Sequence, residues 1–476
     1  MHPHELSILM SSLEKVKLEQ DNPSLLQIPY NSSKAPPPPP SSAKQPATMS
    51  NRDEIPEEAI EIIEKFRSIV STSAHNQPGI KEELLELCYK METVLESPDD
   101  FIQKLRAEPT RYTAVKIGID LGLFEMLGEK PITAAALAEK CEADKLLVAR
   151  ILKHLATTSV VNEVGEDIYK STPVSVALAD QANKATINFS YEVVNPIFQA
   201  LPSYLAMTGY ASDPNTPINS FQFAHKTHLK MFPWLSNHPQ HLANFQAMMD
   251  SRYTNPRTWF DVYPIKERLI SGLAAYMHIQ PRPTKDSDVL LVDVGGSIGS
   301  DMFRFMDYLD AWWTESKGKA IELPAGRIRF VLQDLPAVVE KIDCDALRRK
   351  HYKINSLFEL QGHDFFDVNP VKGARAYYMH AVLRDYDDDE CTKILVNIRK
   401  SMKRGWSRLL LQEWVIPSSG ANFRATRTDM AMMALNSRKE RTAGQWEALL
   451  VVAGLKIAEI YEIDRGFESL IEAEMA

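Results

Sequence analysis

The side chains best suited to chemistry lie in one short run, residues 379–390. His380, Arg384 and Asp385 follow one another closely at the end of an apolar segment. A guanidinium has a pKa above ~12, so Arg384 stays charged and cannot take a proton from a phenol or an alcohol. A fixed cation beside an apolar cavity can instead hydrogen-bond a carbonyl or stabilise developing negative charge. The run therefore predicts a cationic site without a general base at Arg384.

A glycine-rich turn follows a strongly apolar run. Residues 289–294 predict a buried strand, and Asp293, Gly295 and Gly296 lie where it ends. Glycines at a strand-to-helix turn let the backbone approach a ligand at the helix N-terminus. The spacing is not the G-x-G-x-x-G of dinucleotide folds, which disfavours a nicotinamide cofactor.

Two more acidic positions come at the ends of further predicted strands. Asp334 ends residues 328–334 and precedes Leu335. A carboxylate there can accept both hydroxyls of a ribose, and it can also simply cap the next helix. Asp364 and Phe365 follow residues 357–360. An acidic residue and an aromatic ring can grip the edge and face of an adenine, although alone this pair is a common turn.

The elements that must position these residues alternate in type. Apolar runs at 289–294, 328–334, 376–380 and 408–413 predict strands, with helical stretches between them. Such alternation indicates a mostly parallel sheet covered on both faces. We therefore expect a doubly wound, Rossmann-like α/β domain over residues 286–476.

Three further regions precede this domain. Residues 1–50 form a proline-rich leader, which we interpret as a solvated tail, with a polyproline ligand for a partner domain as the alternative. Residues 51–185 predict a helical domain, because apolar residues recur at three- and four-residue steps from Pro56 onward. Residues 186–285 predict a helical link to the α/β domain.

Part of the helical domain has the pattern of a winged helix. We expect a helix over 112–127, helices capped by Thr133 and Asp144, and a hairpin within 160–169. Such a module can bind DNA or serve as a scaffold for dimerisation. The positive face is modest and the chain is acidic, so dimerisation is favoured.

The link is rich in aromatic, methionine and histidine side chains. Its examples include His225, His228, Phe232 and Trp234. Such side chains are commonly core, and next to a cofactor domain they also make a plausible wall for an apolar ligand. For His225 a structural role and a functional one stay equally open.

Composition excludes several classes of protein. The net charge of -9 argues against a nucleic-acid-binding protein, and no run approaches the ~20 apolar residues of a membrane span. The four cysteines show no CxxC spacing, which predicts reduced thiols and no metal site. No signal peptide is apparent at the start, so we expect a cytoplasmic protein.

In order and spacing, these motifs resemble the S-adenosylmethionine-dependent O-methyltransferases of fungi and plants that act on small molecules. The resemblance covers about residues 100–470 and includes the winged-helix dimerisation domain. It implies S-adenosylmethionine as cofactor, a small-molecule substrate and a homodimer. The motifs that carry it are residues 292–296, 333–336, 362–366, 385–391, Glu413 and residues 439–442.

The resemblance assigns roles to the cofactor-binding positions. Asp293, Gly295 and Gly296 would line the methionine end of the cofactor. Asp334, followed by Leu335, would hold the ribose, and Asp364 with Phe365 the adenine. His380 stands where the family often has a basic residue that contacts the cofactor. Ser297 departs from the family pattern, because a glycine is common at that position.

The catalytic positions show a second departure. Glu413 and Glu440 match the acidic residues that flank the family's catalytic histidine, but Arg384 stands at the histidine itself. Arg384-Asp385 resembles the pair found in methyltransferase-fold pericyclases of fungal pyridone pathways, which retain the cofactor without transferring its methyl group. A histidine of the link assists in those enzymes. His225 is the candidate for this role, and His228 is second.

We therefore expect a cyclase that catalyses dehydration or pericyclic ring closure on a polyketide-peptide substrate. Phe232, Trp234 and His228 would contact that substrate. Two alternatives remain. One is an O-methyltransferase that dispenses with the histidine, and the other is a non-catalytic partner protein with the same fold.

Overall fold

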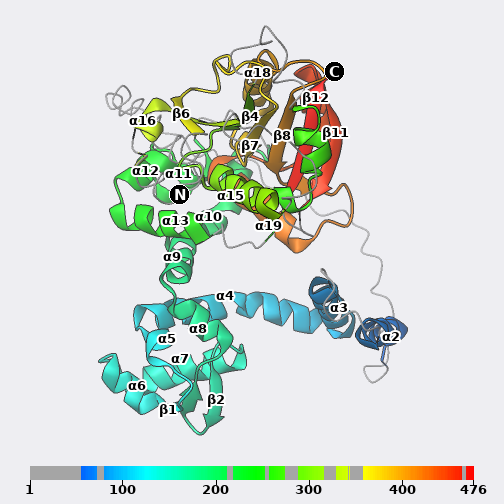
Figure 1. Cartoon of the computed structure of the whole chain (residues 1–476). Helices are drawn as coiled ribbons and strands as arrows, with labels where there is room; N and C mark the ends of the chain where they lie inside the picture. The colour runs from blue at the N-terminus through cyan, green and yellow to red at the C-terminus, as the bar shows by residue number, and fades with distance from the viewer. Residues whose placement is uncertain are drawn as a thin grey trace. The chain divides into compact units, whose positions relative to one another are not determined.

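The computed structural model describes residues 55–71, 80–211, 218–251, 257–273, 288–315, 328–340, 342–343, 358–463 and 468–476. The described residues up to Val174 form one compact unit, and those from Ser175 onward form another (Figure 1). The expected proline-rich leader, residues 1–50, lies outside the described residues.

The first unit contains the predicted winged helix. The side chain of Thr133 accepts a hydrogen bond from Ala136 N at 3.2 Å, and that of Asp144 accepts one from Leu147 N at 2.8 Å, so both predicted caps are confirmed. The three strands of its sheet have the order β1-β3-β2. Its elements are α2 (Glu57–Ser71), α3 (Ile80–Leu95), α4 (Pro98–Asp120), α5 (Leu123–Met126), β1 (Ile132–Thr133), α6 (Ala134–Lys140), α7 (Lys145–Thr157), β2 (Asn162–Gly165) and β3 (Ile168–Lys170).

The helix predicted over residues 112–127 is wrong in its bounds. Helix α4 begins far earlier, at Pro98, and ends at Asp120, and a separate short helix, α5, begins at Leu123. The break occurs at Gly122, whose φ of +64° is left-handed. A glycine adopts this conformation without steric cost, and it ends an α-helix.

The second unit begins with the helical link. Its helix α9 continues directly into η2, a π-helical segment. The elements of the link are α8 (Pro173–Ala179), α9 (Gln181–Phe189), η2 (Ser190–Val194), α10 (Asn195–Met207), α11 (Ser220–His225), α12 (Met231–Ser236), α13 (Pro239–Ser251), η4 (Trp259–Asp261) and η5 (Lys266–Ile270). The described elements of this region are helical, as the sequence predicted for the link over residues 186–285.

Seven of the described strands of the second unit form one sheet, of order β11-β12-β8-β7-β4-β5-β6. The pairs from β8 to β6 are parallel, and β12 runs antiparallel to both neighbours. The expected doubly wound, mostly parallel sheet is confirmed. Its strands are β4 (Val289–Val294), β5 (Arg329–Asp334), β6 (Phe358–Gly362), β7 (Ala376–His380), β8 (Arg408–Glu413), β11 (Leu455–Glu462) and β12 (Ser469–Met475).

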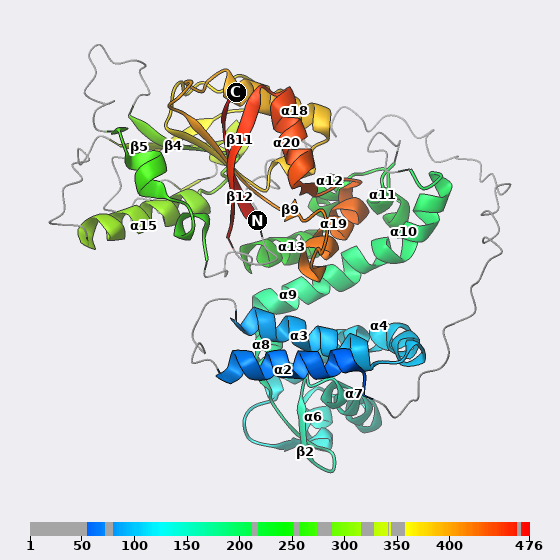
Figure 2. The same cartoon turned by 90° about the vertical axis from the view of Figure 1, so that its right-hand side faces the viewer.

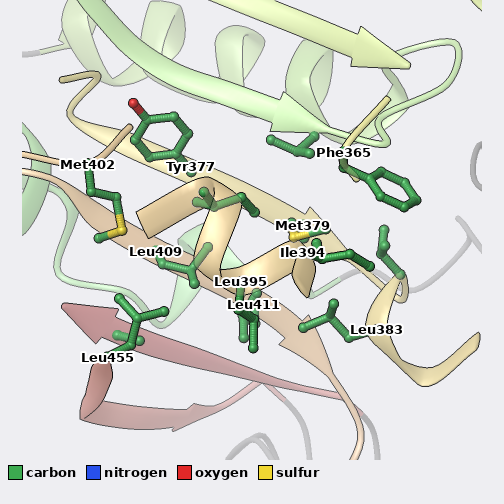
Figure 3. Close-up of a cluster of buried hydrophobic side chains, with 14 of the residues drawn as sticks. Phe365, Tyr377, Met379, Leu383, Ile394, Leu395, Met402, Leu409, Leu411 and Leu455 are labelled. Atoms are coloured by element: carbon green, nitrogen blue, oxygen red, sulfur yellow. The ribbon is translucent and has the colours of Figure 1, made fainter. Parts of the chain in front are cut away.

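Helices cover both faces of this sheet (Figure 2). Side chains of α15 (Ser300–Glu315), together with η4 and η5, pack into one core cluster. Those of α18 (Asp388–Arg399) and α20 (Ala443–Val452) pack into the other. Along β7 neighbouring residues go to opposite clusters, Ala376 and Tyr378 to the first and Tyr377 and Met379 to the second, as the period of two along a strand requires. Figure 3 shows the second cluster, which includes Leu383.

The remaining elements lie at the carboxyl ends of the parallel strands and around them. Helix α16 (Pro336–Val339) follows β5, and the turn η7 (Leu383–Asp385) follows β7. The short strands β9 (Val415–Ile416) and β10 (Arg441–Thr442) pair in parallel, with α19 (Phe423–Asn436) between them in sequence. Ligands of open α/β sheets bind at these carboxyl ends. Among the helices that the structure describes, none has the length and apolarity needed to span a membrane.

Candidate functional site

The turn η7 places Arg384 at the carboxyl end of β7. Between strand and turn, Ala381 has a left-handed φ of +52°, while its N–H still donates to Gln412 O at 2.9 Å. Arg384 is only 4% exposed. Burial alone would lower the pKa of its guanidinium, but Glu440 and Asp385 outweigh that effect and raise it. Arg384 is therefore a permanent buried cation.

Two buried glutamates lie beside this cation, as the resemblance implied. Arg384 Nη1 is 3.6 Å from Glu440 Oε1, which is an ion-pair distance but too long for a hydrogen bond. Glu413, at the end of β8, accepts a hydrogen bond from Leu383 N at 2.8 Å through Oε1. Among the described residues, Glu413 Oε2 and both carboxyl oxygens of Glu440 have no hydrogen-bond partner.

Burial changes the protonation of both glutamates. It raises the pKa of Glu413 to about 7 and that of Glu440 to about 8, although the Arg384 cation opposes the increase in each case. At neutral pH these carboxyl groups are therefore partly protonated and can donate as well as accept a proton. The site offers a fixed cation and titratable acids, but Arg384 itself cannot act as a base. Asp385 is half-buried, and its backbone carbonyl accepts a hydrogen bond from Arg438 Nε at 3.2 Å.

His380 lies between two carboxylates. Its Nδ1 is 2.6 Å from Asp301 Oδ2, and its Nε2 is 2.7 Å from Glu468 Oε2. Burial lowers the pKa of the imidazole, but Glu468 and Asp301 raise it to well above its usual value. Gln412 also donates to Glu468 Oε2, at 2.9 Å. The histidinium therefore joins β7 to the start of α15 and to the start of β12.

The glycine-rich turn packs tightly against the end of β5. The N–H groups of Gly295 and Gly296 donate to Gln333 O at 2.8 and 3.0 Å. A Cβ atom on Gly296 would lie 2.4 Å from Asp293 Cγ, so only glycine fits there. Burial, reinforced by Asp301, raises the pKa of Asp293 well above its usual value.

This turn offers unpaired polar atoms to the expected cofactor, and the roles of Asp293, Gly295 and Gly296 at its methionine end stay predictions. The Oδ2 atom of Asp293 and the Oγ atom of Ser297 are buried polar atoms without a hydrogen-bond partner among the described residues. Such atoms are costly unless something pairs with them. Asp293, Gly295 and Gly296 lie together at the carboxyl end of β4, where the resemblance requires them.

The predicted ribose and adenine residues have their own partners. Asp334 accepts hydrogen bonds from Ser297 N at 3.0 Å and from Leu335 N at 2.7 Å, so it holds the glycine-rich turn against β5. Asp364 is exposed and accepts a hydrogen bond from Phe366 N at 2.9 Å. Phe365 is a buried member of the core cluster in Figure 3. The ribose role of Asp334 and the adenine role of Asp364 and Phe365 stay predictions.

His225 lies in an aromatic cluster of the link. Its Nε2 is 3.0 Å from Val193 O, a carbonyl of the π-helical segment η2. Its ring centroid is 4.5 Å from that of Phe221 and 4.9 Å from that of Trp234. Burial lowers the pKa of His225, so the imidazole is neutral at pH 7. With Nε2 donating to Val193, Nδ1 is left as the acceptor atom.

The other three residues predicted to contact the substrate differ in burial. His228 is exposed, and its backbone carbonyl accepts a hydrogen bond from Gln222. Phe232 is buried in the core of the link and packs edge-on against Phe245. Trp234 is half-buried beside His225. Their contact with a substrate stays a prediction.

Helix α19 connects the aromatic cluster to the Arg384 turn. Ser220 Oγ, at the start of α11, donates to Ala434 O in α19. At the other end of the connection, α19 packs against η7, and its Asp429 accepts a hydrogen bond from Glu440 N at 2.8 Å. The structure therefore brings together Arg384, Glu413 and Glu440 among the predicted catalytic residues, whereas His225 lies in α11, which packs against α19.

Several polar residues of the site were missed by sequence reasoning. Asp301 and Glu468 flank His380, and Arg438 and Arg441 contact the backbone around Arg384. Arg441 stands within the motif 439–442, but nothing in its spacing indicates what it contacts. Glu468 lies in a segment without a distinctive pattern, far in sequence from the strand that it joins.

Asp334 should matter for ribose binding if the predicted role is correct. We expect the Asp334→Ala variant to bind S-adenosylhomocysteine at least tenfold more weakly, because a charged acceptor pair is lost. Isothermal titration calorimetry with S-adenosylhomocysteine and its 2′-deoxy analogue measures this. The wild type should discriminate between the two ligands, and the variant should not. Equal discrimination by both proteins would remove Asp334 from the ribose site.

The left-handed backbone of Ser297 should cost stability. Its φ is +51°, a conformation that costs a non-glycine residue roughly 1 kcal/mol. We expect Ser297→Gly to raise the melting temperature by a few degrees more than Ser297→Ala, because both variants remove the unpaired hydroxyl but only Ser297→Gly also removes the Cβ. Calorimetric melting of the three proteins tests this, and an equal gain in both variants would contradict the strain.

Glu440 should make stability depend on pH. Its folded pKa is raised above the unfolded value, so its stabilising effect is complete below about pH 4.5 and declines as the pH rises through about 8. Urea denaturation between about pH 5 and 8 should show a fall in unfolding free energy that is smaller in Glu440→Gln. The exposed Glu459→Gln is the matched control. Identical pH profiles for Glu440→Gln and the wild type would refute this linkage.

Comparison with protein families places both units of the chain. The family model of the O-methyltransferase domain matches residues 319–456, and that of the O-methyltransferase dimerisation domain matches residues 110–181. The second match coincides with the winged-helix region and supports a homodimer.

Similar proteins cover nearly the whole chain. The O-methyltransferase mpaG of Penicillium brevicompactum is 34% identical over 422 residues, which span 87% of this chain and 98% of the relative. The O-methyltransferase lepI of Aspergillus flavus is 29% identical over 395 residues, which span 82% of this chain and 92% of the relative. Both relatives are fungal proteins named as O-methyltransferases.

Solved structures share the architecture. A structure described as a pericyclic reaction enzyme is 26% identical with a TM-score of 0.69, covering 88% of this chain and 100% of that one. LepI in complex with S-adenosylmethionine is 25% identical with a TM-score of 0.68 and the same coverage. OxaC, at 23% identity and a TM-score of 0.69, shares the fold. On both domain matches and near full-length similarity, this chain belongs to the O-methyltransferase family, whose cofactor is S-adenosylmethionine.

Proposed function

We propose that this chain is a cofactor-dependent cyclase that closes a ring on a polyketide-peptide pyridone, by dehydration, pericyclic reaction or both, without methyl transfer. The observation that carries the proposal is the buried cation: Arg384 stands between Glu440 and Glu413, where the family has a basic histidine. A methyl acceptor needs to lose a proton, and Arg384 cannot take it. A cyclase needs no base at this position.

The acids of the site suit a dehydration step. A partly protonated Glu440 can protonate the hydroxyl of a side-chain alcohol as its C–O bond breaks, so that the oxygen leaves as water. The ring hydroxyl of the pyridone loses a proton in the same step and gives a quinone methide, and that proton restores the acid. Arg384 stabilises the negative charge that develops on the pyridone oxygen. The bound cofactor supplies a further positive charge through its sulfonium.

The aromatic cluster of the link suits the role of substrate wall. His225 and Trp234 are half-buried and in ring contact. We propose that the neutral His225 accepts a hydrogen bond from the pyridone through Nδ1, and that Trp234 packs on the apolar chain. Phe232 would act behind them, as packing. For the assembly as a whole, we propose a cytoplasmic homodimer.

An O-methyltransferase is the second candidate. It is favoured by the names of relatives such as mpaG, and by the presence of both Glu413 and Glu440. This candidate requires an acceptor that is already ionised or a glutamate that takes the proton, because Arg384 cannot act as the base. A non-catalytic partner protein is disfavoured, since it would need neither the buried cation nor its carboxyl partners.

Mass spectrometry distinguishes these functions. Purified protein is incubated with S-adenosylmethionine and a 4-hydroxy-2-pyridone that carries a polyene side chain with a secondary alcohol. We expect a product that is lighter by one water or isomeric, with no S-adenosylhomocysteine released. A product heavier by one methylene, with stoichiometric S-adenosylhomocysteine, would establish methyl transfer and overturn the proposal.

Arg384 variants test the cation directly. We expect Arg384→Met to slow ring closure by roughly 10²–10³-fold, the usual cost of one preorganised electrostatic contact. Arg384→Lys should retain part of the rate because it keeps the charge, and Arg384→His should not gain methyl transfer. Rates come from product quantification under cofactor saturation. An unchanged rate in Arg384→Met would show that the cation has no part in the reaction.

A further inference from the structure

Side chains of neighbouring elements contact the backbone of the turn that carries Arg384. On the N-terminal side, Leu383 N donates to Glu413. On the C-terminal side, the turn presents carbonyl groups to neighbouring side chains, and Cys391 Sγ lies 3.1 Å from Leu383 O. Two arginines donate to these carbonyls, Arg438 to Asp385 O at 3.2 Å and Arg441 to Leu383 O at 3.0 Å.

Arg441 makes the larger share of these contacts. Its Nη2 also donates to Tyr386 O at 3.0 Å, so a single guanidinium spans Arg384 on both sides. Arg441 is 1% exposed, and its guanidinium carbon lies 5.1 Å from the ring centroid of Trp446. Its Nε donates to Asp388 Oδ1 at 2.9 Å. The Arg441 guanidinium is therefore held by an ion pair with Asp388, by the Trp446 ring and by two backbone carbonyls.

The same short segment supplies the counter-ion of Arg384. Glu440 directly precedes Arg441, and its N–H is held by Asp429. A shift of Arg441 would move the backbone of Arg384 and, with it, the carboxyl group that pairs with the Arg384 cation. A misplacement of about 1 Å in a reacting group can reduce a rate ~10²-fold.

We propose that Arg441 is a positioning residue that fixes the Arg384 guanidinium at the reaction site by clamping the carbonyls of Leu383 and Tyr386. Arg441 contacts no reacting atom and acts through the Arg384 turn. Lysine cannot replace it. The planar guanidinium reaches two carbonyls and a carboxylate together, whereas the three donors of a lysine ammonium all lie on one nitrogen and cannot span these acceptors. The inference depends on the proposed function only for the identity of the reaction.

The chain offers a matched control in Arg375, at the opposite end of β7. Arg375 is also buried, and its guanidinium donates to Leu269 O at 3.0 Å and to Trp406 O. It lies over a tryptophan as well, 4.4 Å from the centroid of the Trp406 ring. Arg375→Lys thus reproduces the loss of a buried arginine fork without touching the Arg384 turn.

The first measurement needs no substrate. Hydrogen–deuterium exchange should be faster, by about tenfold, over residues 381–387 in Arg441→Lys, with the strand at 289–294 unchanged. Arg375→Lys should leave the 381–387 segment as in the wild type. If Arg441→Lys folds poorly, Asp388→Asn loosens the same fork from a side chain that is 54% exposed. Unchanged exchange of 381–387 in both Arg441→Lys and Asp388→Asn would overturn the proposal.

The second measurement separates positioning from general destabilisation. With the pyridone alcohol as probe, Arg441→Lys should lower kcat by roughly 10–100-fold and change KM and the affinity for S-adenosylhomocysteine less than about threefold. In an Arg384→Met background the same change should cost almost nothing further, whereas Arg375→Lys should have the same small effect in both backgrounds. If the loss of kcat in the double variant equals the product of the losses in Arg441→Lys and Arg384→Met, the two residues act independently, which contradicts the clamp.

A failure of the cyclase proposal can be distinguished from a failure of the positioning role of Arg441. If the protein transfers methyl groups instead, the double-variant comparison is made on S-adenosylhomocysteine release, and the expected pattern is the same. If the probe is not converted at all, the exchange measurement alone decides whether Arg441 holds the turn.

Discussion

A buried guanidinium is the constraint on which the site depends. Moving a cation out of water costs several kcal/mol, and the cost is recovered only through well-placed partners. At Arg384 the partners are carboxyl groups that are themselves buried. Burial favours the neutral form of each carboxyl group, and the Arg384 cation favours the charged form. The two effects together hold Glu440 and Glu413 near the midpoint of their titration at neutral pH, which is the condition for proton transfer.

The rest of the second unit keeps this arrangement in place. The parallel strands end together and deliver His380 and Glu413 to one edge of the sheet. The histidinium at His380 balances Asp301 and Glu468, so the acidic side chains near the glycine-rich turn do not repel one another unopposed. The acidic side chains near the glycine-rich turn and the Arg384 cation can thus lie at the same end of one sheet.

The sequence predicted the fold well, because the signals for it are local. Apolar runs predicted the strands β4, β5, β7 and β8, and Thr133 and Asp144 marked helix starts by their side-chain chemistry. The split between α4 and α5 was missed, since it depends on the backbone of a single glycine, Gly122.

The site was predictable only in part. Arg384, Glu413 and Glu440 could be named because they fall on motifs of a known family, and the structure brings them together. Arg441 and Glu468 could not, because their partners are set by tertiary packing and lie far away in sequence. Long-range side-chain contacts to backbone carbonyls leave no periodic trace in a sequence. The departure at Ser297, in contrast, was visible in the sequence as a serine where glycine is common, and the structure adds its left-handed φ.

Helix α19 has a consequence for how such a protein can evolve. One of its faces packs on the aromatic cluster through α11, and another on the Arg384 turn. A substitution in α19 can therefore act at once on the packing of α11 and on that of the Arg384 turn. Changes of substrate would be accepted mainly in combination with compensating changes near Glu440, so the two regions should accumulate substitutions in pairs. Under the proposed function, substrate specificity and reactivity are thus coupled through this helix. Directed evolution toward new substrates should therefore vary both regions at once.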